Sequence, residues 1–210
     1  MNVRFLGLVA AVAMSGAAAA PLAAQAVSDS VAFIKAVREG DGGKASALLS
    51  RPGSTVSSAR DSGSGENALH IAVRRRDTPW VNFMAQSGVD TAVADRSGDT
   101  PLGLAARLGY TEGARVLIAR GAKIDGANAR GETPLIIAVQ NKHLDMVRML
   151  VANGANPDKA DSSAGYSARD YARQDRRNAA ILRLLDEKRT PAARPTLPAT
   201  ATAKAPAKPQ

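Results

Sequence analysis

The feature that most constrains the fold is a repeat of 33 residues in the centre of the chain. The segment that starts at Gly98 begins again at Gly131, and Thr100-Pro101-Leu102 recurs as Thr133-Pro134-Leu135. A fixed period of this length is typical of small supersecondary units that stack on one another, because one unit cannot bury its own apolar face.

Each unit is predicted to form two short helices. Thr100 is a suitable N-cap, and Pro101 fits the first helical position because its missing N–H is not needed there. Thr111-Glu112 is expected to open the second helix. Gly121 then supplies the left-handed residue that commonly follows a helix.

These residues resemble the ankyrin repeat. They share its Gly-x-Thr-Pro-Leu-x-x-Ala motif, a glycine in the middle of the repeat, and a second helix that ends in Gly-Ala. The resemblance covers most of the chain between about residues 29 and 189. It implies an all-α ankyrin-repeat solenoid of stacked helix-turn-helix units joined by short β-like turns, and a non-enzymatic scaffold for protein–protein interaction.

The expected segments follow from this period. In order, they are a signal peptide (1–26), an N-terminal capping repeat with a Gly/Ser-rich loop (27–64), three ankyrin repeats (65–97, 98–130 and 131–164), a C-terminal capping repeat (165–189) and a disordered Pro/Ala/Thr-rich tail (190–210). Asp29 or Ser30 is expected to cap the first helix, and Thr78-Pro79 to start the second helix of repeat 65–97. The loop 51–65 is expected to be the most mobile folded segment.

The N-terminal residues have the pattern of a secretory signal. Arg4 precedes the apolar run 5–14, which is shorter than the ~20 residues that span a bilayer. Ala24-Gln25-Ala26 is a small-x-small cleavage site, so Val27 is the expected mature start and the bacterial periplasm the expected location. Cleavage after Ala18-Ala19-Ala20 and a buried N-terminal helix are the alternatives.

Composition excludes several kinds of site. The chain has no cysteine, which excludes disulfides, thiolate metal sites and a cysteine nucleophile. Its two histidines, His70 and His143, have no metal-ligand spacing around them. The ankyrin resemblance implies that His70 hydrogen-bonds the neighbouring turn, while a catalytic base is the alternative. We predict no catalytic residue, cofactor, metal site or small-molecule substrate.

The charge is strongly basic, with 28 Lys and Arg against 19 Asp and Glu. Nucleic acid is nevertheless disfavoured as a partner, because aromatic residues make up only 3% of the chain and the chain carries an export signal. The chain is expected to be a monomer that binds an acidic protein surface.

The partner surface of ankyrin proteins comprises the turn tips and the exposed face of the first helices. Carried over by repeat position, it holds Glu66, Arg74, Arg75, Arg96, Asp99, Arg107, Leu108, Arg130, Glu132, Gln140, Asn141, Tyr166, Gln174 and Asp175. The alternative for the run 74–76 is a solvated helix end whose cations face the last carbonyl groups.

The sequence is compatible with two functions. The first is a periplasmic scaffold that binds a partner through this concave surface. The second is an envelope-associating or stress-related accessory protein that acts through its basic surface and its tail, where Arg194, Lys204 and Lys208 stand without any acidic residue.

Overall fold

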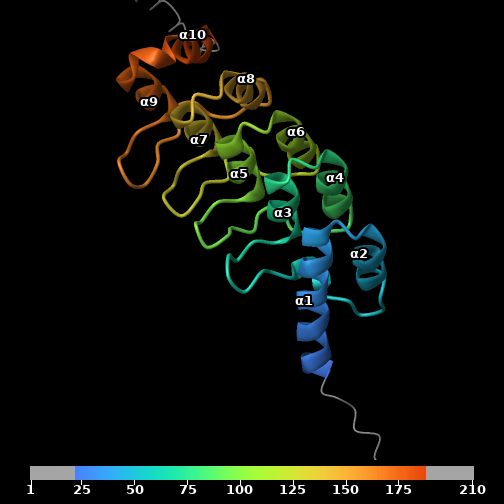
Figure 1. The fold of residues 1–210 in the computed structure, drawn as a ribbon. Helices are drawn as coiled ribbons and strands as arrows, with labels where there is room; N and C mark the ends of the chain where they lie inside the picture. The colour runs from blue at the N-terminus through green and yellow to red at the C-terminus, as the bar shows by residue number, and fades with distance from the viewer. Residues whose placement is uncertain (1–21, 188–210) are drawn as a thin grey trace, which may run out of the picture.

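The computed structural model describes residues 22–187 of the 210-residue chain, and in this part the helices form five hairpins (Figure 1). The pairs are α1 (Leu22–Glu39) with α2 (Gly42–Leu49), α3 (Ala68–Arg74) with α4 (Thr78–Gln86), α5 (Pro101–Leu108) with α6 (Thr111–Ala119), α7 (Pro134–Gln140) with α8 (Leu144–Ala152), and α9 (Ala168–Gln174) with α10 (Ala179–Glu187). Short 3-10 helices lie at Val56–Ser58 (η1) and Arg176–Asn178 (η2).

The hairpins stack in chain order to form an elongated, curved solenoid. Helices α1, α3, α5, α7 and α9 pack one on the next as an inner row, and the other helices form an outer row beside them (Figure 1). The loops that join one hairpin to the next extend to one side of the inner row (Figure 1). This arrangement confirms the predicted all-α solenoid of stacked helix-turn-helix units.

The Thr-Pro-Leu motif forms the start of the inner helices as predicted. The Thr100 hydroxyl accepts a hydrogen bond from the backbone N–H of Gly103 at 3.1 Å, and Pro101 is the first helical residue. Leu102 and Leu135 then lie fully in the core. Burying a leucine side chain stabilises the fold by about 1.5–3 kcal/mol, so the motif sets both the beginning of the helix and its orientation.

The prediction that Asp29 or Ser30 caps the first helix is wrong. Helix α1 begins at Leu22 and continues through both residues, because the alanine-rich residues before Asp29 favour helix. Asp29 instead accepts a hydrogen bond from Arg51 Nη1 at 2.7 Å. It therefore ties α1 to the end of α2.

The predicted cap of α4 is also displaced by one residue. Asp77 is the N-cap and its carboxylate accepts from the Trp80 N–H at 3.1 Å, while Thr78 and Pro79 are the first two helical residues. Aspartate is a strong N-cap, and proline at the second position loses no hydrogen bond within the helix. The dipeptide therefore marks the correct helix start only to within one residue.

Two repeat glycines adopt the left-handed conformation for different reasons. Gly121 follows α6 with φ +89°, and a Cβ atom there would meet nothing within 4 Å. Gly131 has φ +77°, and its Cβ atom would lie 2.4 Å from the backbone nitrogen of Ser162 in the next turn. Glycine is thus required at position 131 by the stacking of the turns as well as by the backbone conformation.

The expected signal segment and the tail lie largely or wholly outside the described residues. None of the helices within residues 22–187 is long and apolar enough to cross a membrane. The loop 51–65 contains η1, where Val56 is buried against the core. The mobility of this loop stays a prediction.

Candidate protein-binding surface

Acid–arginine pairs line the junction between the turns and the inner helices. Glu66 accepts from Arg74 Nε at 2.9 Å, and Asp99 accepts from Arg107 Nε at 2.8 Å and from Nη2 at 2.9 Å. In each pair the carboxylate follows the repeat glycine and the arginine stands eight residues later, at the end of the helix. The spacing of 33 residues therefore repeats the pair along the stack.

The two members of each pair differ in exposure. The side chain of Asp99 is 5% exposed, while that of Arg107 is 34% exposed and that of Arg74 is 56% exposed. Hydrogen bonding to Asp99 raises the pKa of Arg107 above its ordinary value, which keeps the guanidinium charged. The guanidinium groups therefore lie at the surface, and the carboxylates beneath them hold them in place through charged hydrogen bonds.

The third repeat uses a different set of donors around its carboxylate. Glu132 accepts from Gln140 Nε2 at 3.1 Å, from Asn128 Nδ2 at 2.8 Å and from Arg130 Nη2 at 2.6 Å. Burial alone would raise the pKa of Glu132, but the hydrogen bonds from these three donors hold it below its ordinary value. Here the outward cation is Arg130, at the turn tip.

The C-terminal capping repeat (165–189) ends the row with an aromatic residue. Tyr166 takes the place of the carboxylate and is 43% exposed. Its ring packs edge-on against Tyr171, whose hydroxyl donates to Asp161 at 2.6 Å. This hydrogen bond raises the pKa of Tyr171 to about 12. Gln174, eight residues after Tyr166, is exposed at the end of α9.

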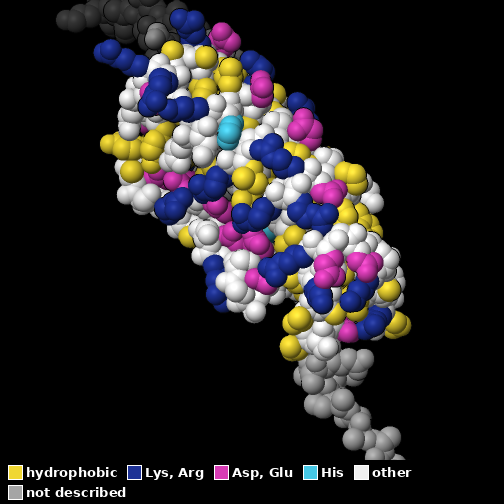
Figure 2. Space-filling model, viewed as in Figure 1, with side chains coloured by type: hydrophobic (Ala, Val, Ile, Leu, Met, Phe, Trp, Pro, Cys, Tyr) yellow, Lys and Arg dark blue, Asp and Glu magenta, His cyan; other side chains and the backbone are white. Residues whose placement is uncertain are grey.

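The charged face is continuous along the solenoid. Figure 2 shows dark-blue basic side chains alternating with magenta acidic ones from the α1 end toward the α9 end. Asn128 Nδ2 also donates to Asp99 at 3.2 Å, which links the second repeat's pair to the third repeat. Asn128 therefore joins the carboxylates of Asp99 and Glu132 in one hydrogen-bonded group.

Several predicted surface residues lie against neighbouring repeats. Arg75 Nη1 donates to the Val37 carbonyl oxygen at 2.8 Å, at the end of α1. Arg76 donates to the Leu108 carbonyl oxygen, and its guanidinium lies over the Tyr110 ring. Arg75 and Arg76 therefore donate to carbonyl groups at helix ends, as the alternative for the run 74–76 expected. The carbonyl groups belong to the neighbouring hairpins.

The remaining predicted residues are polar and partly engaged. Arg96 Nη2 donates to the Ser62 carbonyl oxygen at 2.5 Å, and Asn141 Nδ2 donates to the Ile137 carbonyl oxygen at 2.8 Å. Asp175 lies 2.9 Å from Lys142 Nζ, and hydrogen bonding to Lys142 lowers its pKa to about 2. Arg74, Arg107 and Arg130 are consequently the predicted residues whose guanidinium groups reach the surface and are also held by a buried carboxylate.

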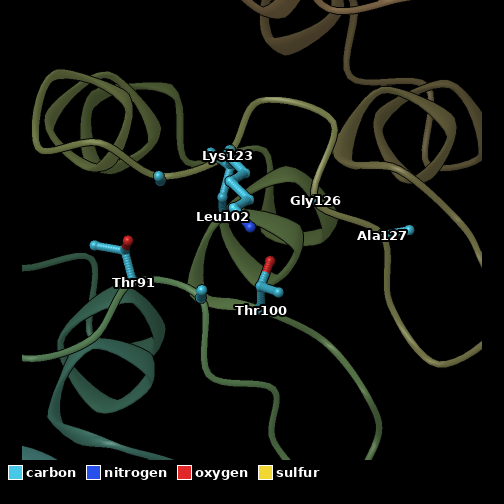
Figure 3. A pocket seen from close by; sticks show the side chains of 8 residues that line it. Thr91, Thr100, Leu102, Lys123, Gly126 and Ala127 are labelled. Atoms are coloured by element: carbon cyan, nitrogen blue, oxygen red, sulfur yellow. The ribbon is translucent and has the colours of Figure 1, made fainter.

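A separate hollow lies between the loop before α5 and the loop after α6. A pocket of about 260 Å³ is lined by Thr91, Thr100, Leu102 and Lys123 (Figure 3), among others. The Thr100 hydroxyl already accepts from the helix backbone. No cluster of His, Cys, Asp or Glu within residues 22–187 has the geometry to hold a metal ion.

The acid–arginine pairs follow a regular spacing in the sequence that the ankyrin resemblance does not single out. Glu66, Asp99 and Glu132 are 33 residues apart, and each has Arg74, Arg107 or Gln140 eight residues later. This regular spacing indicates that the carboxylate and the side chain eight residues later form a pair in each repeat. It does not reveal which partner is buried, because this depends on how the turn folds back on the helix.

Comparison with protein families agrees with this geometry. A family model of three-copy ankyrin repeats matches residues 33–128, and a model of a single ankyrin repeat matches residues 130–162. No match is found among curated proteins. The two matches together span more than half of the chain, and ankyrin repeats are typically non-enzymatic scaffolds for protein–protein interaction. This chain is therefore a member of the ankyrin repeat family.

Proposed function

We propose that the protein is an exported scaffold of the bacterial periplasm, and that it binds an acidic partner protein through the row formed by Arg74, Arg107 and Arg130. The observation that carries this proposal is that each of these exposed guanidinium groups is fixed by a buried carboxylate, Glu66, Asp99 or Glu132.

The chemistry of the guanidinium group supports an acidic partner. Arginine has five N–H donors in a planar fork, and Arg107 uses two of them on Asp99. The remaining donors are available to a carboxylate of the partner. Because the side chain is already held in place, binding costs less side-chain entropy than it would for a free arginine. Binding should weaken as salt rises.

Glutamine variants test the row without leaving a buried carboxylate unpaired. Gln140 already donates to Glu132, eight residues before it, so glutamine can replace Arg74 and Arg107 at the same position. When Arg130 is replaced, Glu132 still accepts from Gln140 and Asn128. We expect the triple variant Arg74→Gln, Arg107→Gln and Arg130→Gln to lose the proteins that the parent captures from envelope extract.

The matched control removes the same charge from the outer helices. Arg115, Arg148 and Arg183 lie on α6, α8 and α10 and are exposed. Their triple glutamine variant should capture the same proteins as the parent. Retention of every captured protein by the Arg74, Arg107 and Arg130 variant would show that the row is not the docking surface.

Export to the periplasm rests on the pattern of residues 1–26. Cleavage after Ala26 would shorten α1 at its N-terminal end. The new start would be exposed, since Val27 is exposed and Phe33 is the first buried residue from Ala26 onward. Fractionation of cells that express the full chain tests the location, and the mass of the recovered protein should correspond to a start at Val27. Recovery of the uncleaved chain in the cytoplasm would contradict export.

A further inference from the structure

We propose that the partner presents an extended acidic segment with one apolar side chain, and that this side chain docks in a pocket at the α1 end of the arginine row. The inference rests on the proposed function, since it defines what the same surface binds. The pocket lies between α1 and the loop before α3, and has a volume of about 260 Å³. Val31 and Ile34 are on its α1 side, and Arg60 and Asp61 are on its loop side.

The pocket has an apolar wall that residues 26–187 leave exposed. Val31 is 65% exposed, whereas Ile34 is buried beside it. In residues 26–187, the exposed large apolar side chains are Val27, Val31 and Tyr166. Small-molecule sites are typically about 300–1,000 Å³ and enclose most of the ligand. A hollow of this smaller size suits a single side chain of a macromolecule.

The rim of the pocket is cationic. Lys35 is exposed, and its Nζ lies 3.8 Å from Glu39 Oε1. Arg38 Nη2 lies 2.8 Å from Asp61 Oδ2. Arg60 Nε donates to the Gly65 carbonyl oxygen at 3.0 Å, so its charge is not neutralised by that bond. The rim therefore has three cations, Lys35, Arg38 and Arg60, against the carboxylates of Glu39 and Asp61. This net positive charge is complementary to a segment with carboxylates on both sides of an apolar residue.

Asp61, the carboxylate that lines the pocket, is held inside the loop. It accepts from the backbone N–H of Ser64 at 2.7 Å and of Gly63 at 3.0 Å. Hydrogen bonding to the Ser64 backbone is the main reason why its pKa lies below the ordinary value, and the nearby Arg38 adds to the effect. Asp61 is therefore ionised, and its negative charge is offset by the ion pair with Arg38.

The pocket is continuous with the arginine row. The Ser64 hydroxyl lies 2.9 Å from Asp61 Oδ1 and 3.2 Å from Glu66 Oε2, and Glu66 holds Arg74. Packed helices lie about 8–10 Å apart, so α1 and α7 are separated by about 27 Å. An extended chain advances about 3.3 Å per residue. A segment of about nine residues can therefore reach from the pocket to Arg130.

The charge of the chain's own termini argues for another molecule as the occupant. Residues 1–21 contain Arg4 and no acidic residue, and residues 190–210 contain three basic residues and no acidic residue. Neither segment complements a cationic rim. The occupant is therefore a segment of a different protein that is rich in Asp and Glu.

Selection from a random peptide library displayed against the full chain tests this inference. Enriched peptides should combine several acidic residues with one aliphatic or aromatic residue. Fluorescence anisotropy should then show about tenfold weaker binding to the Val31→Asp variant, as expected for loss of one anchor contact. Val27→Asp is the matched control, because Val27 is 66% exposed on the same helix and lies outside the pocket lining. Its affinity should equal that of the parent.

The outcomes separate this inference from the proposed function. Acidic peptides that bind Val31→Asp as well as the parent, but lose affinity for the Arg74, Arg107 and Arg130 variant, would overturn the pocket and keep the row. Enrichment of peptides without acidic residues would overturn both. Self-association of the chain that Val31→Asp abolishes would assign the pocket to a second copy, and would also overturn the inference.

Discussion

The imidazole Nε2 of His70 lies 3.0 Å from the backbone carbonyl oxygen of Asp99 in the next repeat. Its Nδ1 accepts from the Asn67 N–H at 3.3 Å, within the capping box that starts α3. Because the ring is fully buried, one side chain joins the start of an inner helix to the following turn. This geometry agrees with the structural role that the ankyrin resemblance implied for His70.

His70 should make stability depend on pH. Burial holds the pKa of His70 below its ordinary value of 6.5. The unfolded chain therefore takes up a proton before the folded one does, so stability falls as the pH drops below about 6.5 and is fully present above it. The melting temperature should fall between about pH 7.5 and about pH 5.5, and this fall should be smaller in His70→Asn. An equal fall in both proteins would contradict a neutral, buried imidazole.

Leucines of the Thr-Pro-Leu motif should dominate the stability of their repeats. Leu102 and Leu135 are fully buried, so Leu102→Ala and Leu135→Ala should each lower the free energy of unfolding by about 2–5 kcal/mol. Leu108 is only partly buried, and Leu108→Ala should have a smaller effect. Urea denaturation measures all three, and equal stability of the three variants would argue against the repeat register.

Replacing glycine should cost different amounts at Gly121 and Gly131. Gly121→Ala introduces only the strain of a left-handed residue, about 1–2 kcal/mol. Gly131→Ala adds a clash with the turn at Ser162, which we expect to cost about 1–3 kcal/mol more. Thermal melting of the two variants compares them directly. A Gly131→Ala protein that is as stable as Gly121→Ala would mean that the turns do not stack this closely.

An amide side chain at position 107 should replace the hydrogen bond that Arg107 donates to Asp99, and an alkyl side chain should not. Asp99 is buried, so Arg107→Leu removes its main partner and should cost about 2–3 kcal/mol. Arg107→Gln retains a donor, as Gln140 does for Glu132, and should cost about 1 kcal/mol or less. Chemical denaturation distinguishes the two. Similar losses for both would show that Asp99 does not depend on this hydrogen bond.

The helices could be predicted because their signals are local. Thr100 and Pro101 define a helix start through contacts within one turn, and the repeat period carries this assignment to Thr133 and Pro134. The failures were also local, since Asp77 competes with Thr78 as a cap and nothing in the sequence after Leu22 stops α1 before Asp29. Propensity and capping define such boundaries only to within a few residues.

The contacts between repeats could not be predicted in the same way. Arg75 was expected on the binding surface, yet it donates to Val37, which is 38 residues away in the chain. The pocket at Val31 was missed because its second side comes from the loop around Arg60 and Asp61. Both features depend on how one hairpin is placed on the next, which a repeat period indicates only in outline.

An NMR titration tests the arginine row most directly. The side-chain Nε–Hε signals of the labelled full chain are followed while a synthetic oligoglutamate peptide is added. The account predicts that the signals of Arg74, Arg107 and Arg130 shift together and return as salt is added. Shifts confined to Arg115, Arg148 and Arg183 on the outer helices would contradict it.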